Sequence, residues 1–198
     1  MINEPLITKQ SNGFPPILVT KNVRVFRPSE IKKLLNTISK SNQAYKFKAL
    51  LFSGARYIEI KLLYDYPDCF NGQTIHLTRD IIKKKKAKLR DRHIRLNYIG
   101  RDAISGYLHS DSGLPSYPTW TENMVRWCKQ GGISSELVGP KSLRKTWESW
   151  LISSYPDKIV YIMASQGHNL TTSLDHYLNI GFMDEDIKEM KEFTIGWL

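Results

Sequence analysis

The sequence is poor in cysteine and has no long apolar run. Its 198 residues include two cysteines, Cys69 and Cys128, which are too few for a disulfide framework and match no metal-ligand spacing. No apolar stretch approaches the roughly 20 residues that span a bilayer, and the first residues lack the apolar core of a secretory signal. These absences exclude a disulfide-stapled domain, and they predict a protein of a reducing compartment such as the cytoplasm, with no membrane partner.

Acidic residues are scarce as well. The chain has 19 Asp and Glu against 29 Lys and Arg, which gives a net charge of +10. Such an excess predicts an anionic partner, with double-stranded DNA as the first candidate. Residues 79–101 contain ten Lys and Arg and two Asp, so most of the excess lies there. A block of this kind is usually a solvated loop, and in a hairpin it is also a plausible phosphate-contacting finger.

The apolar residues that are present predict a folded, mostly helical chain. They make up 41% of the sequence, which suits one good core in a chain of 198 residues. Helical spacing begins at residues 31–38 and recurs along the chain, whereas residues 74–78 and 92–96 alternate as strands do. The expected fold class is therefore α+β, mostly α-helical, with a small antiparallel β hairpin or sheet.

Four polar residues stand out in the last third of the sequence. Lys141 and Arg144 are three apart and therefore share a face of a helix. His168 follows Arg144 by 24 residues, and Tyr177 follows His168 by nine. Guanidinium groups bind phosphate oxygens bidentately, and a phenol can act as a covalent nucleophile. Each residue alone is typical of an amphipathic helix surface, but the ordered set predicts chemistry on a phosphate.

This ordered set resembles the catalytic half of the tyrosine recombinases, the phage-integrase family. Family members carry a pattern like H-x-L-R, then L-G-H about two dozen residues later and a tyrosine nine residues after that histidine. The chain has KSLR at 141–144, QGH at 166–168 and then Tyr177. A second family pattern, L-x-x-T-G-x-R-x-x-E-x-x-x-L, is similar to LLFSGARYIEIKLL at residues 50–63. The resemblance covers roughly residues 27–181.

The resemblance implies a catalytic set of Arg56, Lys85, Lys141, Arg144, His168 and Tyr177. In this set the two arginines clamp the phosphate, the histidine accepts or shares a proton, and the tyrosine attacks to form a 3′-phosphotyrosyl link. The ordinary pKa of tyrosine is about 10, so the phenol needs this help at neutral pH. Preorganised donors around a developing charge are often the largest catalytic contribution. No cofactor, metal or small-molecule substrate is implied.

Two assignments in this set depart from a simple match. Lys141 stands where the family usually has histidine, and we interpret it as an electrostatic substitute of the kind found in divergent archaeal and viral integrases. The general acid in the basic segment is the other, because Lys83, Lys84 and Lys86 fit the spacing nearly as well as Lys85. Glu59 follows the first arginine as it does in the family, where this acid orients that arginine.

The resemblance also divides the chain into three segments. Residues 1–24 are expected to be an N-terminal arm or linker, residues 25–183 the catalytic domain and residues 184–198 a C-terminal helical tail. The apolar face of the tail packs either on its own core or on a neighbouring subunit. Because family members recombine DNA as dimers and tetramers, self-association on DNA is expected. A separate DNA-clamping domain usually precedes the catalytic one, so the chain is either part of a longer integrase or a catalytic-domain-only protein.

Two other functions stay open. A type IB topoisomerase uses the same residue types and the same covalent intermediate, but it acts as a monomer and reseals its own strand. A DNA-binding module that kept the fold and lost catalysis is favoured by the lysine at position 141. Such a module predicts salt-sensitive DNA binding without a covalent adduct.

Overall fold

The computed structural model of the chain describes residues 16–78, 91–167 and 180–198. Three of the predicted catalytic residues, Lys85, His168 and Tyr177, lie outside these ranges.

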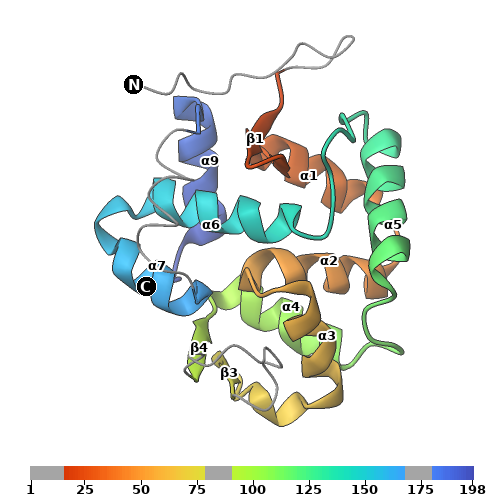
Figure 1. Cartoon of the computed structure of the whole chain (residues 1–198), viewed down its shortest axis with the longest axis vertical. Helices are drawn as coiled ribbons and strands as arrows, with labels where there is room; N and C mark the ends of the chain where they lie inside the picture. The colour runs from red at the N-terminus through yellow and green to blue at the C-terminus, as the bar shows by residue number, and fades with distance from the viewer. Residues whose placement is uncertain (1–15, 79–90, 168–179) are drawn as a thin grey trace.

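The described chain is mostly helical and carries two small hairpins (Figure 1), which confirms the expected α+β class. None of its helices is long and apolar enough to cross a membrane. In chain order the elements are β1 (Leu18–Thr20), β2 (Val23–Val25), α1 (Pro28–Thr37), α2 (Ser41–Ser53), α3 (Tyr57–Asp65), the 3-10 turn η1 (Pro67–Cys69), β3 (Thr74–Leu77), β4 (Arg92–Arg95), α4 (Tyr98–Leu108), α5 (Tyr117–Gln130), α6 (Ser142–Ser154), the 3-10 turn η2 (Pro156–Lys158), α7 (Ile159–Gln166) and α9 (Asp184–Thr194).

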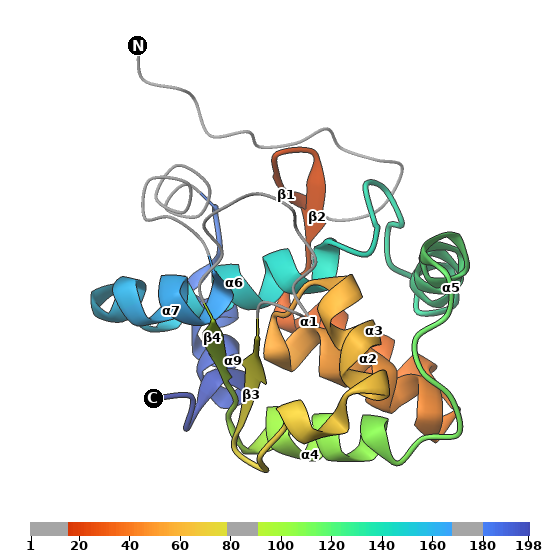
Figure 2. The same ribbon diagram turned by 60° about the horizontal axis from the view of Figure 1, so that its bottom comes forward.

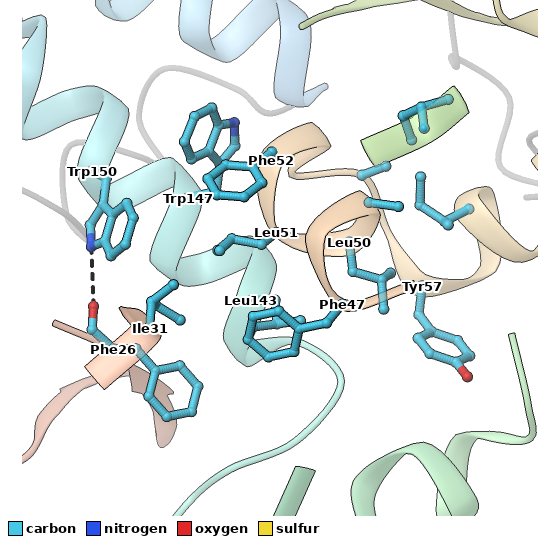
Figure 3. Close-up of a cluster of buried hydrophobic side chains, with 14 of the residues drawn as sticks. Phe26, Ile31, Phe47, Leu50, Leu51, Phe52, Tyr57, Leu143, Trp147 and Trp150 are labelled. Atoms are coloured by element: carbon cyan, nitrogen blue, oxygen red, sulfur yellow. Dashed lines mark hydrogen bonds between the residues drawn. The ribbon is translucent and has the colours of Figure 1, made fainter. Parts of the chain in front are cut away.

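Helix α6 crosses the middle of the molecule and contacts β2, α2, α7 and α9. Its large apolar residues recur at helical spacing, so they fall on one stripe, and Leu143, Trp147 and Trp150 are fully buried. Figure 3 shows this packing: the indole of Trp147 meets Phe52 edge-on with ring centroids 5.4 Å apart. The indole of Trp150 donates a 3.1 Å hydrogen bond to the carbonyl of Phe26. The stripe therefore joins the first hairpin and α2 into one core.

The first hairpin lies within the range expected to be an arm. Strands β1 and β2 pair antiparallel through a two-residue turn at Lys21 and Asn22, both with positive φ, as a hairpin-compatible turn requires. Ile17 and Arg24 are almost fully buried. Regular structure therefore begins before residue 25, because the hairpin packs on α6 and not only on itself.

The second hairpin lies at the opposite end of the molecule from the first (Figures 1 and 2). Its strands match the predicted ones to within a residue and pair antiparallel, with His76 opposite His93 and Leu77 opposite Arg92. The alternation of the strands turns Ile75 and Ile94 into the core. Arg92 shares that inward face, so a charged side chain enters the interior beside apolar ones.

The C-terminal tail packs on its own chain. Helix α9 lies against α1 and α6, and Met190 is fully buried. Beyond the helix, the indole of Trp197 donates a 3.1 Å hydrogen bond to the carbonyl of Arg95. On the outer side, Lys32 of α1 pairs with Glu189 at 3.2 Å. Of the two placements that the sequence left open, the structure has the tail on its own core.

Candidate active site

The segment that holds Arg56 is a tight joint between two helices. Helix α2 ends at Gly54, whose φ of 59° is a left-handed cap that favours glycine. A Cβ atom at Gly54 would also lie 2.7 Å from the side chains of Gln166 and Trp147. Two residues later Arg56 is extended, and its backbone N–H donates to a carboxylate oxygen of Glu59 at 2.7 Å. The joint therefore sets Arg56 at the start of α3, with its side chain about a quarter exposed.

Arg144 lies in the first turn of α6 and is nearly buried. Its Nη1 donates to the carbonyl of Gly54 at 2.5 Å, and its Nη2 donates to the carbonyl of Gln166 at 2.6 Å. These carbonyls end α2 and α7, where the helix dipoles leave partial negative charge. Burial lowers the pKa of Arg144 to about 10, so the guanidinium stays charged at neutral pH. The side chain is thus a cation held between two helix ends.

Arg56 and Arg144 meet at the end of α7. Arg56 Nη2 lies 3.4 Å from the carbonyl of Gly167, next to the Gln166 carbonyl that Arg144 contacts. Gly167 has a φ of 66° and caps α7 in the left-handed conformation, which favours glycine. The next residue along the chain is His168. Two arginines 88 positions apart in the sequence therefore converge on one helix end.

Lys141 is exposed directly before α6, one helical turn ahead of Arg144. It lies on the N-terminal side of the same helix, but it is not part of the buried contacts that join the two arginines. The structure therefore brings Arg56 and Arg144 together. Lys141 lies at the exposed start of α6, which we call the rim of the site.

Arg92 is the residue that sequence reasoning missed. It is about nine-tenths buried, and its two terminal nitrogens bind both carboxylate oxygens of Glu59, at 3.0 and 2.8 Å. Its Nε donates to the carbonyl of Ser165 near the end of α7 at 3.2 Å. The signal was in the alternation of the strand: a residue two positions from Ile94 faces the core, and a buried guanidinium needs an anionic partner.

The electrostatics of this cluster are governed by Glu59. Burial raises the pKa of the Glu59 carboxyl, but the charges and hydrogen bonds of Arg92 and Arg56 lower it more, so the pKa lies below its ordinary value. Three guanidiniums therefore stand near two buried carboxylates, Glu59 and Glu148 of α6. The local charge is positive, which suits an anion such as a phosphate.

Two further observations bound the chemistry of the described residues. They contain no group of three or more His, Cys, Asp or Glu side chains that is arranged to hold a metal ion. A cavity of about 630 Å³ lies between α2, α3 and the start of α5, and its lining includes Lys46, Tyr64 and Ser112 but neither arginine of the site. The arginine cluster and this cavity are separate features.

No protein-family model matches the chain, and no curated protein matches it. A crystal structure of the XerA recombinase is similar to it, with a TM-score of 0.59 at 18% sequence identity. The match covers 85% of this chain and 64% of that one. The chain therefore has a tyrosine-recombinase-like fold, and it spans less than two thirds of the length of that recombinase.

Proposed function

We propose that this chain cuts and rejoins DNA strands as a site-specific tyrosine recombinase, with Tyr177 as the nucleophile. The observation that carries the proposal is the convergence of Arg56 and Arg144 on the end of α7, directly before His168. The fold likeness to a recombinase supports it. The family motifs and the net charge of +10 point the same way.

In the proposed reaction, Arg56 and Arg144 bind the non-bridging oxygens of one phosphodiester. Arg144 is already held by the carbonyls of Gly54 and Gln166, so it needs no rearrangement when negative charge develops on the phosphate. Donors that are fixed before the reaction are the most effective kind. Lys141 adds positive charge from the rim.

The covalent steps conserve the phosphodiester bond energy. The phenol oxygen of Tyr177 attacks the phosphorus, its proton passing to His168, and the bond from phosphorus to the 5′ oxygen breaks. Lys85 donates the proton that makes this leaving oxygen a hydroxyl. A 5′ hydroxyl then attacks the phosphorus of the phosphotyrosyl link, its proton passing back to Lys85. The bond from phosphorus to the Tyr177 oxygen breaks, the phenol recovers its proton from His168, and a DNA strand is restored. Bond making and breaking balance in both steps, so the reaction needs no ATP.

The partner in this proposal is double-stranded DNA, bound by the site and by the basic segment 79–101. Exchange of strands between two DNA molecules requires several active sites, so we propose that the chain forms dimers or tetramers on DNA. Integration of one DNA molecule into another is the corresponding biological reaction.

One observation favours a second candidate, a DNA-binding module without catalysis. Lys141 is exposed and stands where recombinases usually have histidine. If a base is essential at that position, the chain binds DNA without cutting it. A type IB topoisomerase differs from both, because it would relax plasmid without exchanging strands.

The test is to incubate the chain with supercoiled plasmid, to stop the reaction with detergent and to look for protein-linked nicked DNA. The matched control is Tyr177→Phe, which removes only the nucleophilic hydroxyl. Adducts that vanish in this variant support the proposal, and strand exchange between two labelled duplexes then separates a recombinase from a topoisomerase. Plasmid that is bound but uncut by both proteins favours the binding module. Adducts that persist in Tyr177→Phe mean that another residue is the nucleophile.

A further inference from the structure

Arg92 is the one guanidinium of the cluster that the proposed reaction leaves without a task. It lies on β4, inside the basic segment 79–101, but it is about nine-tenths buried. A buried charge is costly unless it is paired with good geometry. Arg92 has that geometry, because each of its two terminal nitrogens donates to a different carboxylate oxygen of Glu59.

Glu59 is shared unequally between two arginines. Arg92 holds it through a two-pronged contact at 3.0 and 2.8 Å, the strongest form of this pair. The side chain of Arg56 contributes one bond, from Nη1 to Oε1 at 2.9 Å, and its Nη2 points toward the carbonyl of Gly167. Two guanidiniums therefore face one carboxylate, which leaves a net positive charge, and Arg56 extends its second terminal nitrogen to the end of α7.

Arg92 also fixes the end of α7 directly. Its Nε donates to the carbonyl of Ser165. A Cβ atom added to Gly167 would lie 2.8 Å from Arg92 Nη1, so the guanidinium packs against the glycine cap itself. The Arg92 side chain thus touches two things: the Glu59 carboxylate, which orients Arg56, and the last turn of α7, directly before His168.

We propose that Arg92 is a positioning residue that neutralises Glu59, so that Arg56 keeps its positive charge for the DNA phosphate, and that anchors the end of α7 beside it. The inference rests on the proposed function, because the phosphate is that of DNA. Without Arg92, Glu59 would pair with Arg56 alone, and one of the two arginines proposed to bind the phosphate would be neutralised.

The decisive experiment is a rescue. We expect Arg92→Gln to slow formation of the Tyr177 adduct on plasmid roughly a hundredfold, which is the size seen when one preorganised donor is lost. Glu59→Gln added to that variant removes the carboxylate that captures Arg56, so adduct formation should recover by about tenfold. A double variant that is as slow as Arg92→Gln, or slower, would overturn the inference, because it would show that Arg92 acts only as structural support.

A second readout does not need cleavage. In a Tyr177→Phe background, binding to a labelled duplex is measured at several KCl concentrations. Arg92→Gln should reduce the slope of log K against log salt by about one, the value expected for one lost phosphate contact, and Glu59→Gln should restore it. Arg92→Lys keeps the charge without the fork, so it should keep the slope and still slow adduct formation. It also serves as the test if Arg92→Gln does not fold.

The matched control is Arg126→Gln, which removes one positive charge from the exposed face of α5, outside both the site and the basic segment. It should leave adduct formation within about twofold, as surface substitutions usually do, and Glu59→Gln should not rescue it.

If the parent binds DNA but forms no adduct, the proposed function fails and the salt slopes alone decide the role of Arg92. An unchanged slope in Arg92→Gln overturns that role while the function stands. A parent that does not bind the duplex overturns both.

Discussion

The core around α6 and the cluster around Glu59 both lie largely in the interior, but different forces hold them. The core packs Trp147, Trp150 and Phe52 by shape and apolar area (Figure 3). The cluster places Arg92 and Glu59 in the interior, where each charge needs a specific partner at hydrogen-bond distance. The apolar core therefore stabilises the fold. The cluster holds positive charge at one point, and burying its charges costs stability.

The packing of the apolar core around α6 is tested most directly by Trp147→Ala. The side chain is fully buried against Phe52, so its loss should lower the free energy of unfolding by about 3–5 kcal/mol. Urea denaturation measures the change. The control is Val160→Ala, at an exposed position of α7, which should change the free energy of unfolding by no more than about 0.5 kcal/mol. A loss below about 1 kcal/mol for Trp147→Ala would contradict the packing described.

On the charged side, Glu59→Leu should cost about 3 kcal/mol, because it leaves Arg92 buried without its partner. Adding Arg92→Met should recover much of this loss, since an apolar pair of similar size replaces the ion pair. A double-mutant cycle by denaturation measures both steps. A double variant that is less stable than Glu59→Leu would show that the ion pair of Arg92 and Glu59 stabilises the fold more than we expect.

The joint between the two regions is tested by Gly54→Ala. We expect a loss of about 2–3 kcal/mol, because the left-handed backbone is strained and the new Cβ would crowd Trp147 and Gln166. Gly72→Ala is the matched control: its φ is also positive, but nothing lies within 4 Å of the new Cβ. Thermal melting of the two variants isolates the crowding, and equal losses would mean that backbone strain alone matters at Gly54.

Acid separates the two regions further. The folded pKa of Glu59 is depressed, so its stabilising contribution is complete above the unfolded pKa of roughly 4.3 and is lost as the pH falls through the lower folded value. Stability should therefore fall more steeply below about pH 4 in the parent than in Glu59→Gln. Urea midpoints at several pH values measure this. Parallel pH curves for the two proteins would show that the pairing does not depress the pKa.

The smallest effect on stability is expected at the rim. Lys141→Gln should change the free energy of unfolding by less than about 0.5 kcal/mol, because the side chain is exposed. The same variant should slow formation of the Tyr177 adduct about tenfold if Lys141 supplies charge to the phosphate. Equal adduct formation in parent and variant would show that the lysine has no catalytic part.

Much of the architecture followed from the sequence because it depends on neighbouring residues. The stripe of Leu143, Trp147 and Trp150 predicts the buried face of α6, and the strand alternation predicts β3 and β4. Gly167 as the cap of α7 also follows from local backbone preferences. The hairpin at Leu18–Val25 was not predicted, since its stability comes from packing on α6.

For the candidate site, the sequence shows which residue types are present and in what order, and the family resemblance predicts that Arg56 and Arg144 act together. Lys85, His168 and Tyr177 stay predictions of that motif. The packing of distant elements brings Arg56 and Arg92 to the same carboxylate, Glu59, and places both with Arg144 at the end of α7. The physical reason is distance along the chain: helix periods and caps are set within a few residues, whereas a buried ion pair between α3 and β4 exists only once those elements have packed together.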